Sequence, residues 1–238
     1  MLKSIKVVLG TAVIVGLTTL GACSRQEDPA PPAKPAVDAV PPPPAPTPDA
    51  GAAISPALTA LLIRKHSPVL GPANAPVTVV EFLDPACEAC AAYAPVVRQI
   101  ELVYPQEVRV VVRFAAFHPG SDEAIRVLDA ARRQGKFEPV LDALFANQEE
   151  WASHRAPNVA RAWEIAGDAG LNVVKAKRTA RDQQAEAVLR VEGEDIVALK
   201  VERTPTFFVN GRPLLNYGPE PLMNVVSEEV SRAREARK

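Results

Sequence analysis

The chain has 238 residues and a formal net charge of −1, and 47% of its residues are hydrophobic. That length allows one large or two small domains, each with a proper core. The balanced charge creates no overall field that would attract nucleic acid, so we expect no nucleic-acid partner. Three cysteines are too few for a disulfide scaffold, and the function is therefore expected to come from a local site.

The N-terminal segment has the features of an export signal. Two lysines precede an uncharged, mostly apolar run at residues 7–22, which is short for a bilayer span of about 20 residues. A Leu-Gly-Ala sequence directly before Cys23 resembles the bacterial lipobox. The resemblance implies a signal peptide at 1–22, lipidation of Cys23 and, because Ser24 follows, a periplasm-facing position at the outer membrane. An uncleaved membrane anchor with an incidental cysteine is the alternative.

Residues 23–55 are expected to form a linker. They are rich in proline and alanine and contain almost no large apolar side chains that could enter a core. Proline-rich chain extends by about 3.1 Å per residue. The linker would thus be a stiff tether between a lipidated Cys23 and a folded domain at 56–238.

The folded part begins with a predicted strand, helix and strand. Residues 77–83 are apolar and β-branched apart from one carboxylate, which is typical of a buried central strand. Residues 87–104 have the period of an amphipathic helix, with Val96, Ile100 and Val103 on its apolar face. Residues 108–114 are a second buried strand. This order predicts a parallel pair of strands.

A long helical stretch is predicted next, from residue 121 to about 200. Residues 206–209 then form a short strand, followed by an Asn-Gly turn and a return strand at 214–217. Leucine and valine residues at helical spacing after residue 221 indicate a closing helix. The fold class is therefore α/β, with a helical insertion at about 121–200.

Cys87 and Cys90 lie at the expected start of the first helix. Residues three apart in one helical turn can meet disulfide geometry, which needs Cα atoms roughly 5.5 Å apart. Unpaired N–H groups and the helix dipole favour the Cys87 thiolate, and Cys90 is placed to resolve a mixed disulfide. A structural disulfide and half of a metal site are the alternatives. Because zinc needs two more ligands and there is no second cysteine pair, we expect no metal.

Glu81 is the charged residue in the first predicted strand. If the strand is central, its carboxyl group is buried behind the cysteine pair and its pKa is raised. Such a group could pass the proton that Cys90 must lose or gain. The alternative is an edge strand that directs Glu81 to solvent.

Pro205 stands at the start of the strand at 206–209, where it cannot donate a ladder hydrogen bond. A close approach of another segment to this point is expected.

Residues 81–84, 87–90 and 204–211, with the helical block between them, resemble the DsbA-like branch of the thioredoxin superfamily. The resemblance covers about residues 69–229. It implies a thioredoxin-like fold with a helical insertion and a cis Pro205 packed against the cysteine pair. It also implies that the Thr204 backbone binds extended substrate chains and that Cys87 is the nucleophile.

The sequence departs from the strongly oxidising members of that branch, which have proline and histidine between the cysteines. Here Glu88 and Ala89 occupy those positions. A carboxylate beside Cys87 is expected to raise the thiol pKa and to make the couple more reducing. Replacing Glu88 by histidine should then raise the reduction potential. Thr204 before the proline also occurs in isomerases and reductases of the family, so the direction of exchange stays open.

These observations predict an exported protein thiol–disulfide oxidoreductase that needs no cofactor beyond the Cys87–Cys90 pair. Its expected partners are cysteine-containing exported proteins, an unidentified membrane redox partner and the membrane that holds the lipid anchor. One alternative is a module that holds Cu(I) between the two thiolates. The other is a redox-independent chaperone that binds unfolded chains near Pro205. No role is predicted for the three histidines, which are His66, His118 and His154.

Overall fold

A computed structural model describes residues 54–238. The predicted signal peptide, Cys23 and nearly all of the predicted linker at 23–55 lie outside the described residues. Between residues 54 and 238, no helix is both long and apolar enough to cross a membrane.

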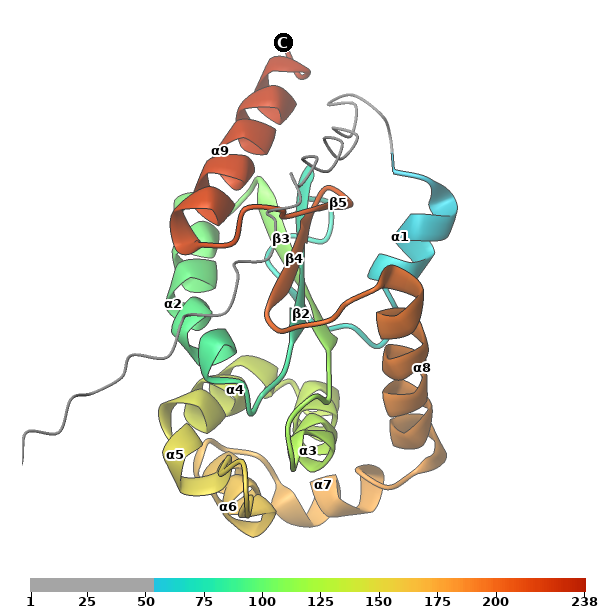
Figure 1. The fold of residues 1–238 in the computed structure, drawn as a ribbon, viewed down its shortest axis with the longest axis vertical. Coiled ribbons are helices and arrows are strands. Elements are labelled where there is room, and N and C mark those ends of the chain that lie inside the picture. Colours follow the sequence, from blue (N-terminus) through green and yellow to red (C-terminus); the bar gives the residue numbers. More distant parts are fainter. Residues whose placement is uncertain (1–53) are drawn as a thin grey trace, which may run out of the picture. The chain divides into compact units, whose positions relative to one another are not determined.

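The described chain forms a mixed sheet with helices on both faces and at one end (Figure 1). The elements, in chain order, are α1 (Pro56–Leu62), β1 (Val69–Leu70), β2 (Val77–Leu83), α2 (Glu88–Val103), β3 (Val108–Phe114), α3 (Ser121–Arg133), α4 (Phe137–Ala146), α5 (Gln148–Trp151), α6 (Val159–Asp168), α7 (Val173–Thr179), α8 (Gln183–Leu199), β4 (Thr206–Val209), β5 (Arg212–Pro213) and α9 (Pro219–Glu235).

The sheet has the strand order β1-β3-β2-β4-β5, which puts β2 at its centre. Strands β2 and β3 are parallel because α2 carries the chain back across the sheet between them. The other pairs are antiparallel. The predicted parallel pair and the strand at 206–209 are confirmed, and so is the thioredoxin-like α/β class with its helical insertion.

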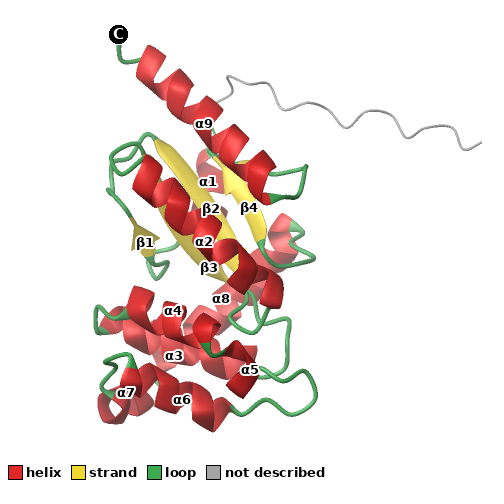
Figure 2. Ribbon diagram, turned by 90° about the vertical axis from the view of Figure 1, so that its left-hand side faces the viewer, coloured by secondary structure: helices red, strands yellow, loops and turns green. Residues whose placement is uncertain are grey.

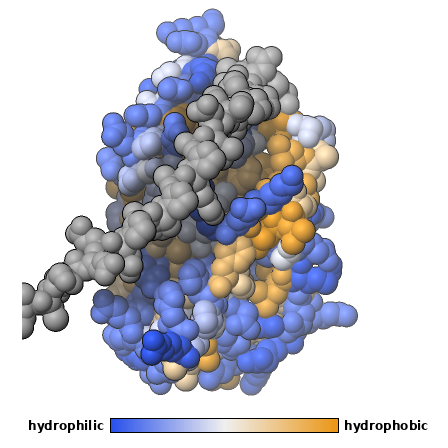
Figure 3. Space-filling view, viewed as in Figure 1, coloured by the Kyte–Doolittle hydropathy of each residue, from blue (hydrophilic) through white to orange (hydrophobic). Residues whose placement is uncertain are grey.

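Two helices cover each face of the sheet. Figure 1 shows α2 and α9 on one face and α1 and α8 on the other. Because strand residues alternate between faces, Val79 packs beneath α2 and α9 whereas Val80 packs on the opposite side with Leu62 of α1. Figure 3 shows hydrophobic residues gathered on the side where α1 and α8 lie; Val197 of α8 is one exposed example.

Helices α3 to α7 of the insertion pack together beyond one end of the sheet, around a core that the ends of β2 and β3 also enter (Figure 2). Leu128, Leu144 and Trp151 lie in this core, and both cysteines belong to the same cluster of buried side chains. The insertion therefore forms one wall of the region where β2 gives way to α2.

Two local predictions differ from the structure. The buried stripe of α2 includes Tyr93, Val97 and Ile100, whereas Val103, the last residue of the helix, is rotated away from that stripe and is 49% exposed. The return strand is β5 rather than 214–217. The tight Asn-Gly turn starts the pairing at once, and the pairing stops at Pro213, which has no N–H group.

The predictions also missed a buried ion-pair cluster that fastens α8 to the sheet. Arg113 of β3 has no exposed surface, and its guanidinium donates hydrogen bonds to Glu192 Oε2 at 3.0 Å and to Asp195 Oδ2 at 2.6 Å. Both carboxylates are buried as well. Arg64 also pairs with Asp195, so two guanidinium groups balance the two carboxylates away from water.

Candidate active site

The two cysteines lie where β2 ends and α2 begins. Cys87 is the N-cap residue of α2 and adopts an extended backbone conformation, while Cys90 lies inside the first turn. Both are free thiols; Cys87 is 6% exposed and Cys90 has no exposed surface. An attacking group must be reached by its substrate, so only Cys87 is placed for a first contact.

Hydrogen bonds around Cys87 favour its thiolate. The thiol of Cys90, the side chain of Thr204 and the backbone N–H groups of Ala89 and Cys90 together lower the pKa of Cys87 to about 5, against the opposing effect of burial. The pKa of Cys87 is thus low although the Glu88 carboxylate follows it directly in the chain. The Glu88 carboxylate is directed to His154, whose Nε2 lies 2.7 Å from Glu88 Oε1.

Cys90 has the opposite electrostatic environment. Burial, the hydrogen bond to Cys87 and the charge of Glu81 all raise the pKa of the Cys90 thiol. Its Sγ atom accepts the backbone N–H of Asp84 at 3.4 Å. A thiol in this environment needs a nearby base before it can act as a nucleophile.

Glu81 is buried on the central strand, so the alternative that it faces solvent from an edge strand is wrong. Burial, the Cys87 charge and the Glu101 charge raise the pKa of Glu81 to about 8. Its Oε1 atom has no hydrogen-bond partner among the described residues. A carboxyl group with this pKa is available both as an acid and as a base near neutral pH.

The segment before β4 passes directly beside Cys87. The Thr204–Pro205 peptide bond is cis and Pro205 is buried, as the resemblance implied. The Cys87 thiol donates a hydrogen bond to the backbone carbonyl of Thr204, with 3.4 Å between Sγ and the oxygen. A cavity of about 150 Å³ opens beside Pro205, with Arg203 and Tyr217 in its lining.

Asp84 joins the cysteine loop to the start of the insertion, a role that was not predicted from the sequence. Its fully buried carboxylate accepts the backbone N–H groups of Ala86 and Phe117, each at 2.8 Å, and that of His118 at 3.0 Å. The Ser121 hydroxyl donates to the same carboxylate. The position of Asp84, directly after a buried strand, was the available signal.

Two of the three histidines also lie at the site. His118 Nδ1 is 2.8 Å from Asp84 Oδ2, and the His118 and His154 rings pack edge to face with centroids 5.4 Å apart. His66 instead contacts Glu192 in the cluster behind the sheet. His118 lies in the loop between β3 and α3 and His154 in the loop between α5 and α6, and no local sequence pattern marks them.

Within residues 54–238 no group of three or more histidine, cysteine or carboxylate side chains is arranged to hold a metal ion. The described site instead brings together four groups: the Cys87 thiol, which favours its thiolate form, the buried Cys90 thiol, the buried Glu81 carboxyl group and the Thr204 backbone. This set suits nucleophilic attack on a disulfide followed by intramolecular resolution.

Comparison with known proteins supports this chemistry. A family model described as thioredoxin matches residues 64–227. A thioredoxin-like oxidoreductase from Silicibacter pomeroyi DSS-3 has 27% sequence identity and a TM-score of 0.62, over 74% of this chain and 97% of that one. Two further proteins share the fold. BdbD from Bacillus subtilis has 21% identity and a TM-score of 0.61, over 70% of this chain and 94% of that one. For α-DsbA1 from Wolbachia pipientis, the identity is 17% and the TM-score 0.67, over 76% of this chain and 99% of that one.

The similar curated sequences are much longer proteins. A Na(+)/H(+) antiporter NhaA from Herminiimonas arsenicoxydans is 36% identical over 149 residues, which are 61% of this chain and 22% of that protein. NhaA 3 from Salinispora tropica is 33% identical over 177 residues, which are 72% and 26% respectively. The chain thus spans about a quarter of the length of these relatives.

Proposed function

The chain belongs to the thioredoxin family and has a DsbA-like fold, and from this premise we propose that it exchanges disulfides with other proteins through Cys87 and Cys90. The observation that carries the proposal is the pairing of a thiol whose pKa is lowered to about 5 with a fully buried partner thiol one turn away. Substrates, partners and residue roles below are parts of the same proposal.

Exchange begins when the Cys87 thiolate attacks one sulfur of a substrate disulfide. An S–S bond forms between Cys87 and the substrate, and the second substrate sulfur leaves as a thiolate. Cys90 then loses its proton and attacks Cys87, which releases the first substrate sulfur and leaves the Cys87–Cys90 disulfide. The same steps in reverse donate a disulfide to a substrate dithiol.

Glu81 is the proposed proton acceptor and donor for Cys90. Its charge raises the pKa of the Cys90 thiol, so the two groups are electrostatically coupled. The pKa of Glu81, raised to about 8, matches the proton affinity that general acid–base catalysis needs near neutral pH.

Thr204 and Pro205 are proposed to hold the substrate chain. The Thr204 carbonyl already lies within hydrogen-bond distance of Cys87, so an extended chain paired with this backbone would bring its cysteine to the thiolate. The adjacent cavity leaves room for a neighbouring substrate side chain.

We propose the disulfide-donating direction. A lowered thiol pKa stabilises the reduced protein, which makes the disulfide form a stronger oxidant. This reverses the reducing character expected from Glu88, because the Glu88 carboxylate is paired with His154.

The proposed setting is the cell envelope. The apolar run and the lipobox-like sequence before Cys23 support export and lipid anchoring, with the domain facing the periplasm from the outer membrane. Substrates would be exported proteins with cysteines, and a membrane redox partner would restore the oxidised pair. Cysteine chemistry of this kind suits an oxidising compartment.

The test is the reduction potential of the Cys87–Cys90 pair, measured in glutathione buffers and read by thiol alkylation. A value near about −120 mV would support disulfide donation, and one near about −270 mV would reverse the direction. The absence of any reversible two-electron transition, or full exchange activity in Cys87→Ser, would overturn the function itself.

A further inference from the structure

The buried carboxyl group of Glu81 lines a small cavity on the side of α2 away from the cysteines' substrate face. The cavity has a volume of about 30 Å³ and lies among β1, β2, β3, α2 and α4. Roughly 10–15 Å³ is enough for one water molecule, which needs polar partners. The Oε1 atom of Glu81 has no hydrogen-bond partner among the described residues and can bond to such a water.

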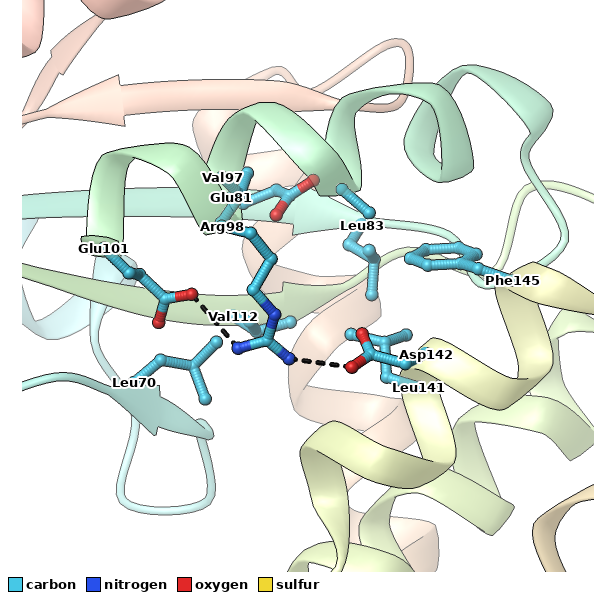
Figure 4. Close-up of a pocket in the computed structure, with 11 residues that line it drawn as sticks. Leu70, Glu81, Leu83, Val97, Arg98, Glu101, Val112, Leu141, Asp142 and Phe145 are labelled. Carbon is cyan, nitrogen blue, oxygen red and sulfur yellow. Dashed lines mark hydrogen bonds and ion pairs between the residues drawn. The ribbon is translucent and has the colours of Figure 1, made fainter. Parts of the chain in front are cut away.

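The other polar groups of the cavity reach the surface. Arg98 donates hydrogen bonds to Glu101 Oε2 at 3.2 Å and to Asp142 Oδ2 at 3.0 Å, and the side chains of Arg98 and Asp142 are 37% and 55% exposed. Figure 4 shows the carboxyl groups of Glu81, Glu101 and Asp142 arranged around the Arg98 side chain. The lining thus runs from a buried acid to solvent-accessible charges.

We propose that this cavity is the route by which Glu81 exchanges its proton with solvent, through a bound water and the carboxylate of Glu101, which Arg98 holds in place. The inference rests on the proposed function, because it needs Glu81 to change protonation during exchange. Glu101 never touches the reacting sulfurs, so its role is that of a positioning and relay residue.

The sheet topology explains why a separate route is needed. Thr204 lies on the β4 side of β2, whereas the cavity opens on the β3 and β1 side. A substrate chain held at Thr204 covers Cys87, which is already only 6% exposed. The proton must therefore leave while the substrate-facing side is closed.

The proton balance is simple. When Cys90 attacks Cys87, its proton passes to Glu81, the Cys87–Cys90 bond forms and the bond from Cys87 to the substrate breaks. Glu81 then passes the proton to the cavity water, and Glu101 accepts one from that water and releases it to solvent. The reverse sequence supplies a proton when the disulfide is donated.

The test is the rate constant for resolution of a preformed Cys87 mixed disulfide by Cys90, measured in H₂O and in D₂O on the full chain. Glu101→Gln removes the relay carboxylate, and Ala94→Leu fills the cavity without removing a charge. Each should slow resolution by about tenfold, less than the ~100-fold cost of losing a general base, and should increase the solvent isotope effect.

Two control variants distinguish loss of the proton route from a general disturbance of α2. Glu138→Gln also removes a partner of Arg98, but Glu138 does not line the cavity, and Ala92→Leu adds the same bulk to an exposed position of α2. In both control variants, Cys90 should resolve the mixed disulfide at the rate found in the unmodified chain. If Glu101→Gln does not fold, the resolution rate of Ala94→Leu alone tests the proposed route.

Resolution at the unmodified rate in folded Ala94→Leu would overturn the route, whatever Glu101→Gln does, since an effect of Glu101 alone would be electrostatic. Failure of the proposed function looks different. In that case the unmodified chain would form no mixed disulfide at Cys87, and no resolution step would exist to measure.

Discussion

The Sγ atom of Cys87 lies 3.4 Å from the backbone carbonyl oxygen of Thr204, a residue 117 positions further along the chain. The thiol therefore acquires its environment only when β4 pairs with β2 and brings Thr204 to the start of α2. Reactivity at Cys87 should depend on both segments.

The pH profile of Cys87 alkylation tests that dependence. With the pKa of Cys87 lowered to about 5, the rate with iodoacetamide should be level above about pH 6 and fall below pH 5. Thr204→Val removes the side-chain hydroxyl group of Thr204, which contributes to the lowered pKa of Cys87, and should move the midpoint upward. Thr206→Val is the control, because the Thr206 hydroxyl bonds the Arg203 carbonyl instead. A midpoint near 9 in the unmodified chain would contradict the description of the site.

Glu81→Gln should make the reduced protein more stable at high pH. The pKa of Glu81 is raised to about 8 in the folded chain, so the stability linked to its proton is complete below the ordinary value near 4.5 and is lost as pH rises through about 8. Glutamine has no proton to lose. On going from pH 4.5 to pH 8.5, the free energy of unfolding of the variant should therefore rise by roughly 3–5 kcal/mol relative to that of the unmodified chain.

Urea unfolding at those two pH values measures the difference. The gain should be smaller in the oxidised protein, since the Cys87 charge contributes to the raised pKa of Glu81. An equal stability difference at both pH values would show that the carboxyl group is not protonated in the folded state.

Glu88 and His154 should shift the reduction potential in opposite directions. Glu88→His removes an anion next to the Cys87 thiolate and should raise the potential, as expected from the sequence. His154→Ala leaves the Glu88 carboxylate unpaired and should lower it. Both side chains are largely exposed, so each shift should be only about 10–30 mV. Glu150→His, on α5 and paired with Arg161, should change nothing. Equal potentials in all three variants would mean that Glu88 has no influence on Cys87.

Arg113→Met should destabilise the fold without changing the cysteine pair. It leaves two buried carboxylates without their common partner, which typically costs about 3–5 kcal/mol. Arg190→Met removes an exposed pair with Glu194 on the same helix and should cost less than about 1 kcal/mol. Denaturant unfolding compares them, and similar losses in the two variants would argue against a structural role for the buried cluster.

Sequence patterns predicted the centre of the fold because its signals are local. The β-branched runs that became β2 and β3 alternate with a helical period, and an α/β layout follows from their order. Glu81 was recognisable because it is the single charge in an apolar strand. Cys87 and Cys90 were recognisable by their spacing.

The remainder of the site depends on contacts between distant segments. His118 and His154 look like ordinary polar residues, and only the packing of the insertion brings them to the cysteine loop. Glu101 has no distinctive sequence pattern around it, yet its side chain borders the cavity behind Glu81. The pairing of Glu88 with His154 could not be predicted for the same reason, since the two residues are far apart in the sequence.

The most direct test of thiol–disulfide exchange is to incubate full-length Cys90→Ser with a disulfide-linked peptide and to map the adduct by mass spectrometry. Without Cys90 to resolve it, the mixed disulfide should accumulate one to one and map to Cys87. A protein that stays unmodified at Cys87, at a pH where its thiolate is expected to predominate, would contradict the account.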